Sequence, residues 1–353
     1  MSGHPALPLP PAVAPDQQAV RRFVEHALER ARVLGWELPP PGEGATRELW
    51  AELTALGRLD LAHARIIEPH LDALAILRQA GREDLAGTDE TWAVWAAEGP
   101  GEPLLAVPGG VVAPEAWTLT GSKPWCSLAD SVTRAVVTAH VTDEHGTPTG
   151  HRRAFVVATD HPGFAPEPAS EWISHGLAEV TTVPVSFEHV PVEPLGADEW
   201  YLTRPGFAWG GMGVAAVWLG GAQAVADLLW EQLGHPRRPV DEAALTALGR
   251  LDLELGAARA VLDRAAQAVD DGDAAGDRGA AWALRVRRTV ADAAESVISV
   301  VSRATGPGPL TGNPAHVRRV ESLQVYIRQD HAERDTAALG RTLLELGEED
   351  TPW

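Results

Sequence analysis

Cysteine and positive charge are both scarce in this sequence of 353 residues. Cys126 is the single cysteine, which excludes an internal disulfide and a cysteine-based metal cluster and fits a reducing, cytoplasmic environment. Lysine and arginine number 29 against 49 aspartates and glutamates, so the formal net charge is −20. Nucleic acids and anionic membranes attract clustered positive charge, so neither is expected as the main partner.

Long apolar runs are also missing. No stretch of about 18 consecutive apolar residues is present, so no transmembrane helix is expected. The opening residues, "MSGHPALPLPPAVAPD", lack the basic and apolar regions of a signal peptide. Their proline and alanine content predicts a disordered arm over residues 1–15.

Helical spacing dominates the next part of the chain, residues 16–87. Apolar residues recur at helical intervals from Asp16 to Leu34, with Asp16 as the expected N-cap and Gly35 as the expected stop. Two further helices are expected around residues 49–56 and 59–77, the second bent at Pro69. We therefore expect an N-terminal helical domain.

The residue pattern changes over residues 88–200. Six short segments rich in β-branched or aromatic residues are separated by glycine, proline and aspartate, a pattern typical of a β-barrel or sandwich. From residue 201 to 353, four long helices are expected at 207–233, 241–270, 277–305 and 314–346. Asn313 and Pro314 supply an N-cap and a first helical residue for the last of them. The pattern predicts a C-terminal four-helix bundle, and hence an α+β fold overall.

One segment of the β region, "LTGSKPWCSLAD" at residues 119–130, resembles the acyl-CoA dehydrogenase superfamily. The resemblance implies that Trp125 packs against a flavin ring and that Ser127 hydrogen bonds its edge, with Cys126 between them. Taken without the resemblance, Trp125 is equally suited to an ordinary core, Cys126 to a small buried filler and Lys123 to a solvated turn.

Two more segments share the resemblance in order and spacing. "VSFEHVPVEPLG" at residues 185–196 is similar to the segment that closes the family's barrel. "TGPGPLTGNPAHVRR" at residues 305–319 is similar to the glycine loop that approaches the cofactor of a neighbouring subunit. Gly306 and Gly308 would let backbone come close to phosphate, although the loop could also only terminate a helix.

The sequence departs from the family pattern at both sides of the expected cofactor. Ala97 in "WAAEGP" replaces a threonine that contacts the flavin. In "WEQLGHP", Trp230 and Leu233 replace an arginine and a phenylalanine that serve the adjacent subunit's cofactor. Arg237 and Arg238 could supply charge nearby.

The base that removes the α-proton of an acyl thioester is a glutamate in the family. In the matching stretch, "VESLQVYIRQDHAERD", the alignment places His331 at that position and Asp330 one residue before it, and a shift of one residue would exchange them. Asp252 and Glu254 on an earlier bundle helix are alternatives. A third interpretation makes Asp330, His331 and Glu333 a solvated helix face, with Arg328 and Arg334 as partners.

The resemblance as a whole implies an FAD-dependent oxidoreductase that dehydrogenates an acyl-CoA or acyl-carrier thioester and passes electrons to an electron-transfer flavoprotein. A histidine at the base position also resembles the flavin-dependent monooxygenases of the same fold. A relative that only binds flavin or acyl ligands is the third alternative. We expect a homodimer or homotetramer and no metal site, since no metal-ligand spacing is present.

Overall fold

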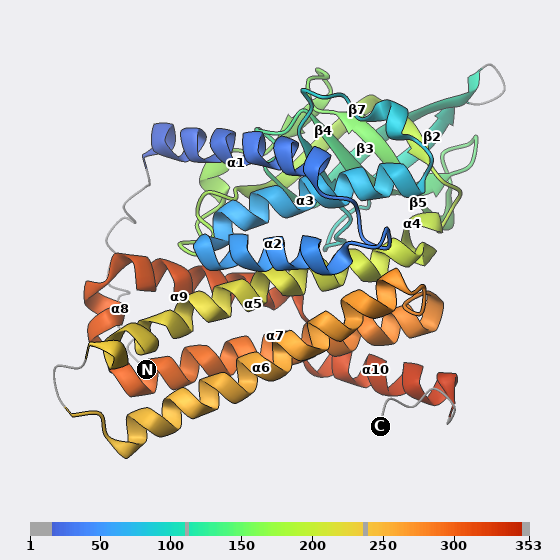
Figure 1. Cartoon of the computed structure of the whole chain (residues 1–353). Coiled ribbons are helices and arrows are strands. Elements are labelled where there is room, and N and C mark those ends of the chain that lie inside the picture. The colour runs from blue at the N-terminus through green and yellow to red at the C-terminus, as the bar shows by residue number, and fades with distance from the viewer. Residues whose placement is uncertain (1–15, 110–112, 236–238, 348–353) are drawn as a thin grey trace, which may run out of the picture.

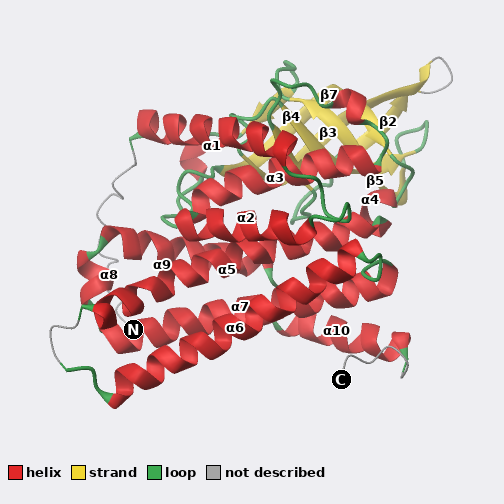
Figure 2. Cartoon of the chain, viewed as in Figure 1, coloured by secondary structure: helices red, strands yellow, loops and turns green. Residues whose placement is uncertain are grey.

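The computed structural model describes residues 16–109, 113–235 and 239–347, with side chains described from residue 116 in the second stretch. The predicted disordered arm, residues 1–15, lies outside the described residues, as do Arg237 and Arg238. The chain forms a helical layer, a sheet and a bundle of long helices, and the strands gather at one upper corner (Figures 1 and 2).

The N-terminal layer contains three helices, α1 (Gln17–Glu37), α2 (Thr46–Leu59) and α3 (Leu61–Gln79). The Asp16 side chain accepts a hydrogen bond from the backbone of Gln18, which confirms the predicted N-cap. The predicted stop at Gly35 is wrong, because α1 continues two residues further. A Cβ on Gly35 would lie 2.5 Å from Cδ1 of Leu74 on α3, so a larger residue there would displace that leucine side chain.

The β region follows a short 3₁₀ turn, η1 (Glu83–Leu85), and contains seven strands. Six of them coincide with the six predicted segments, and the three-residue β6 is an addition. A second 3₁₀ turn, η2 (Ala169–Glu171), precedes the last strand. The strands are β1 (Trp92–Trp95), β2 (Leu105–Gly109), β3 (Ala113–Ser127), β4 (Arg134–Thr142), β5 (Pro148–Ala158), β6 (Phe164–Pro166) and β7 (Thr182–Leu195).

The sheet closes on itself. Its strand order is β1-β4-β2-β3-β7-β5, and β5 also pairs with β4, so β4, β2, β3, β7 and β5 form a closed ring, while β1 pairs only with β4. Closure leaves few unpaired strand edges, which is how small barrels avoid edge-to-edge association. The predicted central β-barrel is therefore confirmed.

The C-terminal part is built on long antiparallel helices. A short helix, α4 (Trp200–Thr203), leads into α5 (Pro205–Gly234), which is followed by α6 (Glu242–Asp270) and α7 (Gly276–Thr305). Then come α8 (Gly308–Gly312), α9 (Pro314–Tyr326), η3 (Ile327–Gln329) and α10 (Glu333–Leu346). The side chain of Asn313 caps α9 by accepting from the backbone of His316, as predicted.

The prediction of one continuous helix over residues 314–346 is wrong. The chain leaves helical geometry after Gln329 and resumes it at Glu333, with Ala332 at a φ of +49°. The break follows from burial of Asp330, whose carboxylate contacts Arg288 on α7 and accepts from the backbone of Ala332.

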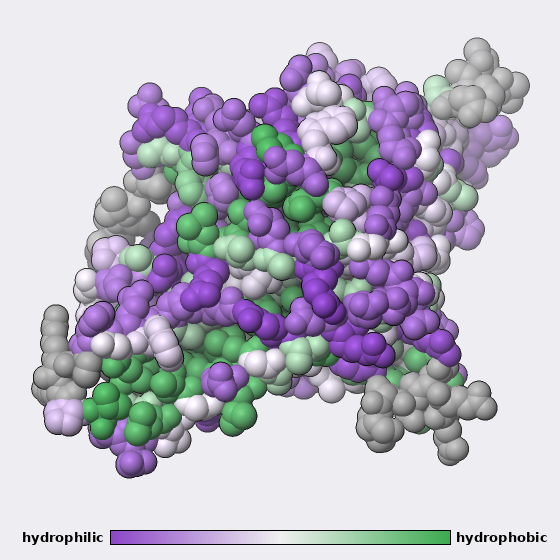
Figure 3. Space-filling model, in the orientation of Figure 1, coloured by the Kyte–Doolittle hydropathy of each residue, from purple (hydrophilic) through white to green (hydrophobic). Residues whose placement is uncertain are grey.

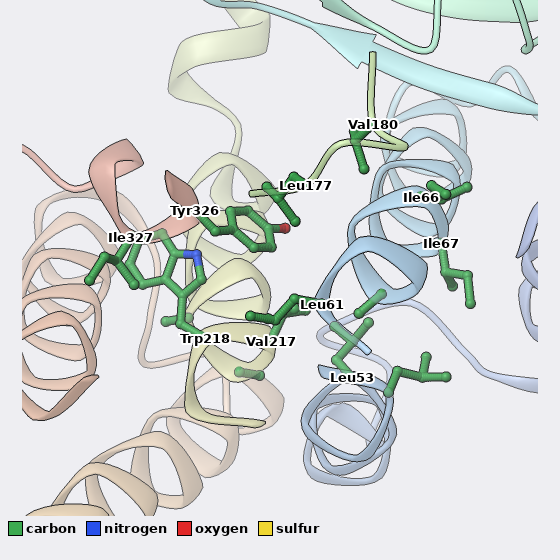
Figure 4. Packing of buried hydrophobic residues seen from close by; sticks show 14 of the residues in the cluster. Leu53, Leu61, Ile66, Ile67, Leu177, Val180, Val217, Trp218, Tyr326 and Ile327 are labelled. Atoms are coloured by element: carbon green, nitrogen blue, oxygen red, sulfur yellow. The ribbon is translucent and has the colours of Figure 1, made fainter. Parts of the chain in front are cut away.

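Helix α5 joins the N-terminal layer to the bundle. It is apolar and long enough to cross a membrane by composition, but 83% of its most apolar window is buried inside the protein. Its apolar residues are therefore the core between the two helical layers. Figure 4 shows Val217 and Trp218 of α5 beside Leu61 of α3 and Tyr326 of α9.

Candidate functional site

Trp125 projects from a bulge in β3. The register of β3 against β7 shifts between Lys123 and Cys126, so Pro124 and Trp125 form an extra, unpaired step. Trp125 has a φ of +59° and is 55% exposed, although it is one of the largest apolar side chains in the chain. A bulky residue is rarely stable at positive φ, and bulges commonly re-aim side chains at functional sites. The fold therefore presents an indole face to solvent.

Ser127 lies at the end of the same strand with its hydroxyl turned inward. Its Oγ is 2.9 Å from Oγ1 of Thr182 on β7 and 3.5 Å from Nη2 of Arg65 on α3. The backbone oxygen of Ser127 accepts from Nε1 of Trp95 at 3.0 Å. The end of β3 is thus held from the barrel on one side and from the N-terminal helices on the other.

Cys126 and Lys123 are both buried beneath this bulge. Burial raises the pKa of the Cys126 thiol, so it is an inert filler and not a reactive group. The interpretation of Lys123 as a solvated turn residue is wrong: it is 1% exposed, and its Nζ donates to Glu98 at 2.8 Å and Thr138 at 3.0 Å. Burial lowers the pKa of Lys123, and the Glu98 carboxylate opposes that shift. Lys123 therefore anchors the bulge from inside the barrel.

Ala97 lies in the segment that follows β1, and this segment reaches Trp125. A Cβ built on Gly99 would lie 3.3 Å from Nε1 of Trp125 and 2.9 Å from Pro124. Ala97 is exposed, while Glu98 between them binds Lys123. The structure therefore brings the Ala97–Gly99 segment and the Trp125 bulge together, although they are far apart in the sequence.

Behind Ser127, a row of cationic and aromatic side chains crosses to the bundle. The guanidinium of Arg65 lies 5.7 Å from the centre of the Tyr326 ring, and Tyr326 packs edge-on against Trp218. Arg287 stacks over Trp218 at 4.6 Å. In Figure 4 the hydroxyl of Tyr326 points toward α3, and it has no hydrogen-bond partner among the described residues. Such stacking fixes the ring orientations and links α3, α9 and α7.

Glu68 is an acidic group in this row that the sequence analysis missed. It is 8% exposed, and its carboxylate lies 3.6 Å from Nη1 of Arg65. Burial raises the pKa of Glu68 to about 7, and Arg65 opposes the shift. A carboxylate of that pKa can take up or release a proton near neutral pH. A glutamate three residues after a helical arginine looks in sequence like a surface ion pair, so only burial distinguishes it.

Glu68 also lines a cavity of about 250 Å³ that we call the N-terminal cavity. The end of α1, the Leu38–Pro41 segment, α2, α3, the Glu83–Glu90 segment and the first turns of α5 enclose it. Leucine, proline and tryptophan make up nearly half of the residues that line it. Arg65 therefore stands between the Ser127 end of β3 and a cavity-lining carboxylate.

Asp330 and His331 are separated by the break before α10. Asp330 is buried, contacts Arg288 and caps the next turn through Ala332. His331 is exposed, and its Nδ1 lies 3.3 Å from the carboxylate of Asp335. The interpretation as a continuous solvated helix face is wrong for Asp330, and Arg328 pairs instead with Glu295 on α7.

The remaining predicted positions lie elsewhere in the molecule. Gly306 and Gly308 flank the start of α8, at the far left of Figure 1 and away from the sheet, and each has open space where a Cβ would be. Glu254 on α6 accepts from Arg250 and Ser296, so it is already engaged. Trp230 lies exposed near the end of α5. Within the described residues, no group of three His, Cys, Asp or Glu side chains is placed to hold a metal ion.

Both the sequence and the structure are similar to those of known proteins. Residues 200–326 match the family model of the acyl-CoA dehydrogenase C-terminal domain. The whole structure is similar to that of butyryl-CoA dehydrogenase from Megasphaera elsdenii. The similarity covers 96% of this chain and 100% of that one, at a TM-score of 0.68 and 16% identity. Residues 200–326 therefore match the C-terminal domain of the acyl-CoA dehydrogenase family, and the chain as a whole has the acyl-CoA dehydrogenase fold.

Other solved structures are equally similar. KijD3, solved with FMN and a dTDP-linked amino sugar, matches over 96% of both chains at a TM-score of 0.72 and 21% identity. Dibenzothiophene monooxygenase (TdsC) from Paenibacillus matches over 94% of this chain and 97% of that one, at 0.70 and 15%. No curated protein matches the sequence. At these identities the similarity establishes the fold alone, and the reaction of this chain has to be argued from its own side chains.

Proposed function

We propose that the chain is a flavin-dependent oxidoreductase whose flavin ring lies against Trp125. The observation that supports it is the bulge, which holds an exposed indole at positive φ beside the Ala97–Gly99 segment and two residues before Ser127. An indole face suits a planar ring by stacking, and a hydroxyl suits the polar edge of that ring. Bound flavin would supply the two-electron redox chemistry that no side chain provides.

FAD is the proposed cofactor. Its adenosine half would extend toward a neighbouring subunit, where the open space at Gly306 and Gly308 admits backbone close to phosphate. Trp230 and Leu233 replace charged and aromatic contacts on that side, so the flavin half carries most of the binding. The same wall at Trp125 fits FMN, the cofactor in the KijD3 complex. Mass spectrometry of the released cofactor distinguishes the two.

The reaction we propose first is α,β-dehydrogenation of an acyl-CoA or acyl-carrier thioester, with an electron-transfer flavoprotein as acceptor. This reaction needs a base near the flavin, and Asp330 and His331 were the predicted bases. Asp330 is engaged by Arg288 and Ala332, and His331 faces solvent. Glu68 is the better-placed base, because it is buried, titrates near neutral pH and is one side chain away from Ser127.

A second candidate is an oxygen-using monooxygenase. The observation that favours it is the ion pair of Asp330 with Arg288, which gives the α9–α10 junction a structural task. The similarity to TdsC supports the same alternative at the level of the fold. Glu68 would then hold or donate a proton beside the substrate without removing one from carbon.

The test is anaerobic mixing of the oxidised holoprotein with acyl thioesters of several chain lengths, followed by the flavin absorbance. Dehydrogenation predicts bleaching that Glu68→Gln abolishes, and that Asp330→Asn and His331→Gln leave in place. Glu68→Asp should retain part of the rate, since the acid group remains. Bound flavin that no thioester bleaches eliminates the dehydrogenase. A protein that neither retains nor takes up flavin eliminates both enzymes and leaves a binding relative.

A further inference from the structure

The N-terminal cavity has the composition of a ligand site. Its volume of about 250 Å³ is close to the lower end of the range for small-molecule pockets, which is roughly 300–1,000 Å³. Three tryptophans, Trp36, Trp50 and Trp209, and several leucines and prolines line it. Nε1 of Trp209 donates to the backbone of Ala274 at 2.7 Å, so this ring is fixed in the wall. The cavity therefore has at least one fixed aromatic side.

One hydrogen-bond donor of this wall has no partner. Trp50 is 1% exposed, and its Nε1 is buried without an acceptor among the described residues. A Cβ built on Gly213, another lining residue, would lie 3.5 Å from that nitrogen. Buried indole N–H groups normally have an acceptor, because burial removes the water that would otherwise accept from them. The glycine leaves room beside the donor for an acceptor atom.

His70 provides a second donor in the same cavity. Its Nδ1 accepts from the backbone of Trp92 at 3.2 Å, and burial lowers the pKa of His70 to about 4. The ring is therefore neutral and carries its proton on Nε2. That nitrogen lies next to Gly35 of α1, another lining residue, 3.3 Å from where a Cβ would be. Two N–H groups thus border a mainly apolar space.

The charged side chains around the cavity are nearly all neutralised by partners within the protein. Only Glu83, at the rim, has no ion partner among the described residues. The ion pairs of the others are Arg32–Asp89, Arg78–Glu43, Glu68–Arg65, Asp72–Arg204 and Glu90–Arg134. An ionic ligand would have to compete with these pairs, whereas an uncharged one would not.

We propose that the N-terminal cavity binds a compact, uncharged ring compound whose oxygen accepts a hydrogen bond from Trp50 Nε1 or His70 Nε2. The aromatic walls hold the ring, and the donors hold a carbonyl or ether oxygen. Binding at this site needs no flavin, so its test does not depend on the oxidoreductase proposal.

The test compares two probes of the same shape, acetophenone and α-methylstyrene, in which a carbonyl oxygen is replaced by a methylene group. Binding to the flavin-free full chain is followed by ligand-observed NMR titration. We expect acetophenone to bind about fivefold tighter or more, the factor that one hydrogen bond supplies. Trp50→Phe keeps the ring but removes the N–H, and His70→Phe removes the other donor. One of the two variants should abolish the preference.

Gly213→Ala tests the location. Its Cβ would make ordinary contacts with Trp50 and Leu53, so the variant should fold while excluding both probes. Gly249→Ala on α6 is the matched control, because nothing lies within 4 Å of its Cβ, and it should leave both affinities unchanged. The proposal is overturned if neither probe binds at millimolar concentration, if both bind equally, or if Gly213→Ala leaves binding intact.

Discussion

Arg318 on α9 donates two hydrogen bonds to the carboxylate of Asp60 at the start of α3. Its Nε and Nη2 lie 2.8 and 3.1 Å from the two carboxylate oxygens, and its Nη1 binds Glu179 at 2.5 Å. Asp60 itself caps α3 by accepting from the backbones of Ala62 and His63. One guanidinium therefore ties the bundle to the N-terminal layer and to the loop before β7.

Arg318→Met should destabilise the protein by about 2 kcal/mol, the typical effect of losing hydrogen bonds to a charged group. Arg58 makes a similar two-pronged contact with Asp227 but is more exposed, so Arg58→Met should cost less than about 1 kcal/mol. Chemical denaturation of both variants measures the difference. Equal losses would show that the Arg318 cluster has no special role.

Acid should weaken the contact between Arg318 and Asp60. Burial alone would raise the pKa of Asp60, but the hydrogen bonds from Arg318 outweigh it, and the pKa is lowered overall. The unfolded chain then binds the proton more readily, so this stability is present above pH 4 and is lost as pH falls below the ordinary aspartate range. Asp60→Asn should flatten the acid limb of a stability curve. An unchanged acid limb in that variant would contradict the assignment.

Glu68 should make the stability of the protein depend on pH in the opposite direction from Asp60. Its pKa of about 7 exceeds the ordinary value, so the folded state holds a proton that the unfolded chain has released. Stability should therefore fall between pH 5 and pH 8, by up to about 3 kcal/mol at ~1.4 kcal/mol per pKa unit. Glu68→Gln should remove the decline. Denaturation curves at the two pH values test this without any assay of activity.

Trp125→Gly should separate stability from cofactor binding. Glycine adopts the positive φ of the bulge freely, so the flavin-free variant should be as stable as the parent, or more stable by about 1 kcal/mol. Loss of the ring should weaken flavin retention by at least the ~0.5–1.5 kcal/mol of an aromatic contact. Trp36→Ala, at a similarly exposed tryptophan on α1, is the control. A variant that retains flavin with an unchanged spectrum would place the ring elsewhere.

The bundle should assemble into a dimer or tetramer through an apolar patch. Trp230, Leu245 and Leu253 are 66%, 49% and 75% exposed, and apolar atoms gather at the lower left of Figure 3, where α6 begins in Figure 1. Leu253→Glu should lower the sedimenting mass, whereas Leu344→Glu on α10, an equally exposed leucine, should not. A parent protein that sediments as a monomer with flavin bound would refute the inter-subunit cofactor site.

The sequence by itself determined the order of the elements, and it supplied the prediction that Trp125 packs against a flavin. Apolar spacing and breakers are local signals, so the three helices, six of the seven strands and the caps at Asp16 and Asn313 could be predicted. The break after Gln329 could not, because it depends on Arg288, which is 42 residues away from Asp330 in the chain.

Burial was the quantity that only the tertiary structure decided. Lys123 and Glu68 are charged residues that look solvated in sequence, but the barrel covers one and the packing of α3 against the bundle covers the other. Their altered pKa values follow from that packing. The unpartnered indole of Trp50 likewise becomes visible only when α2, α3 and α5 enclose a common cavity, since no short stretch of sequence encodes it.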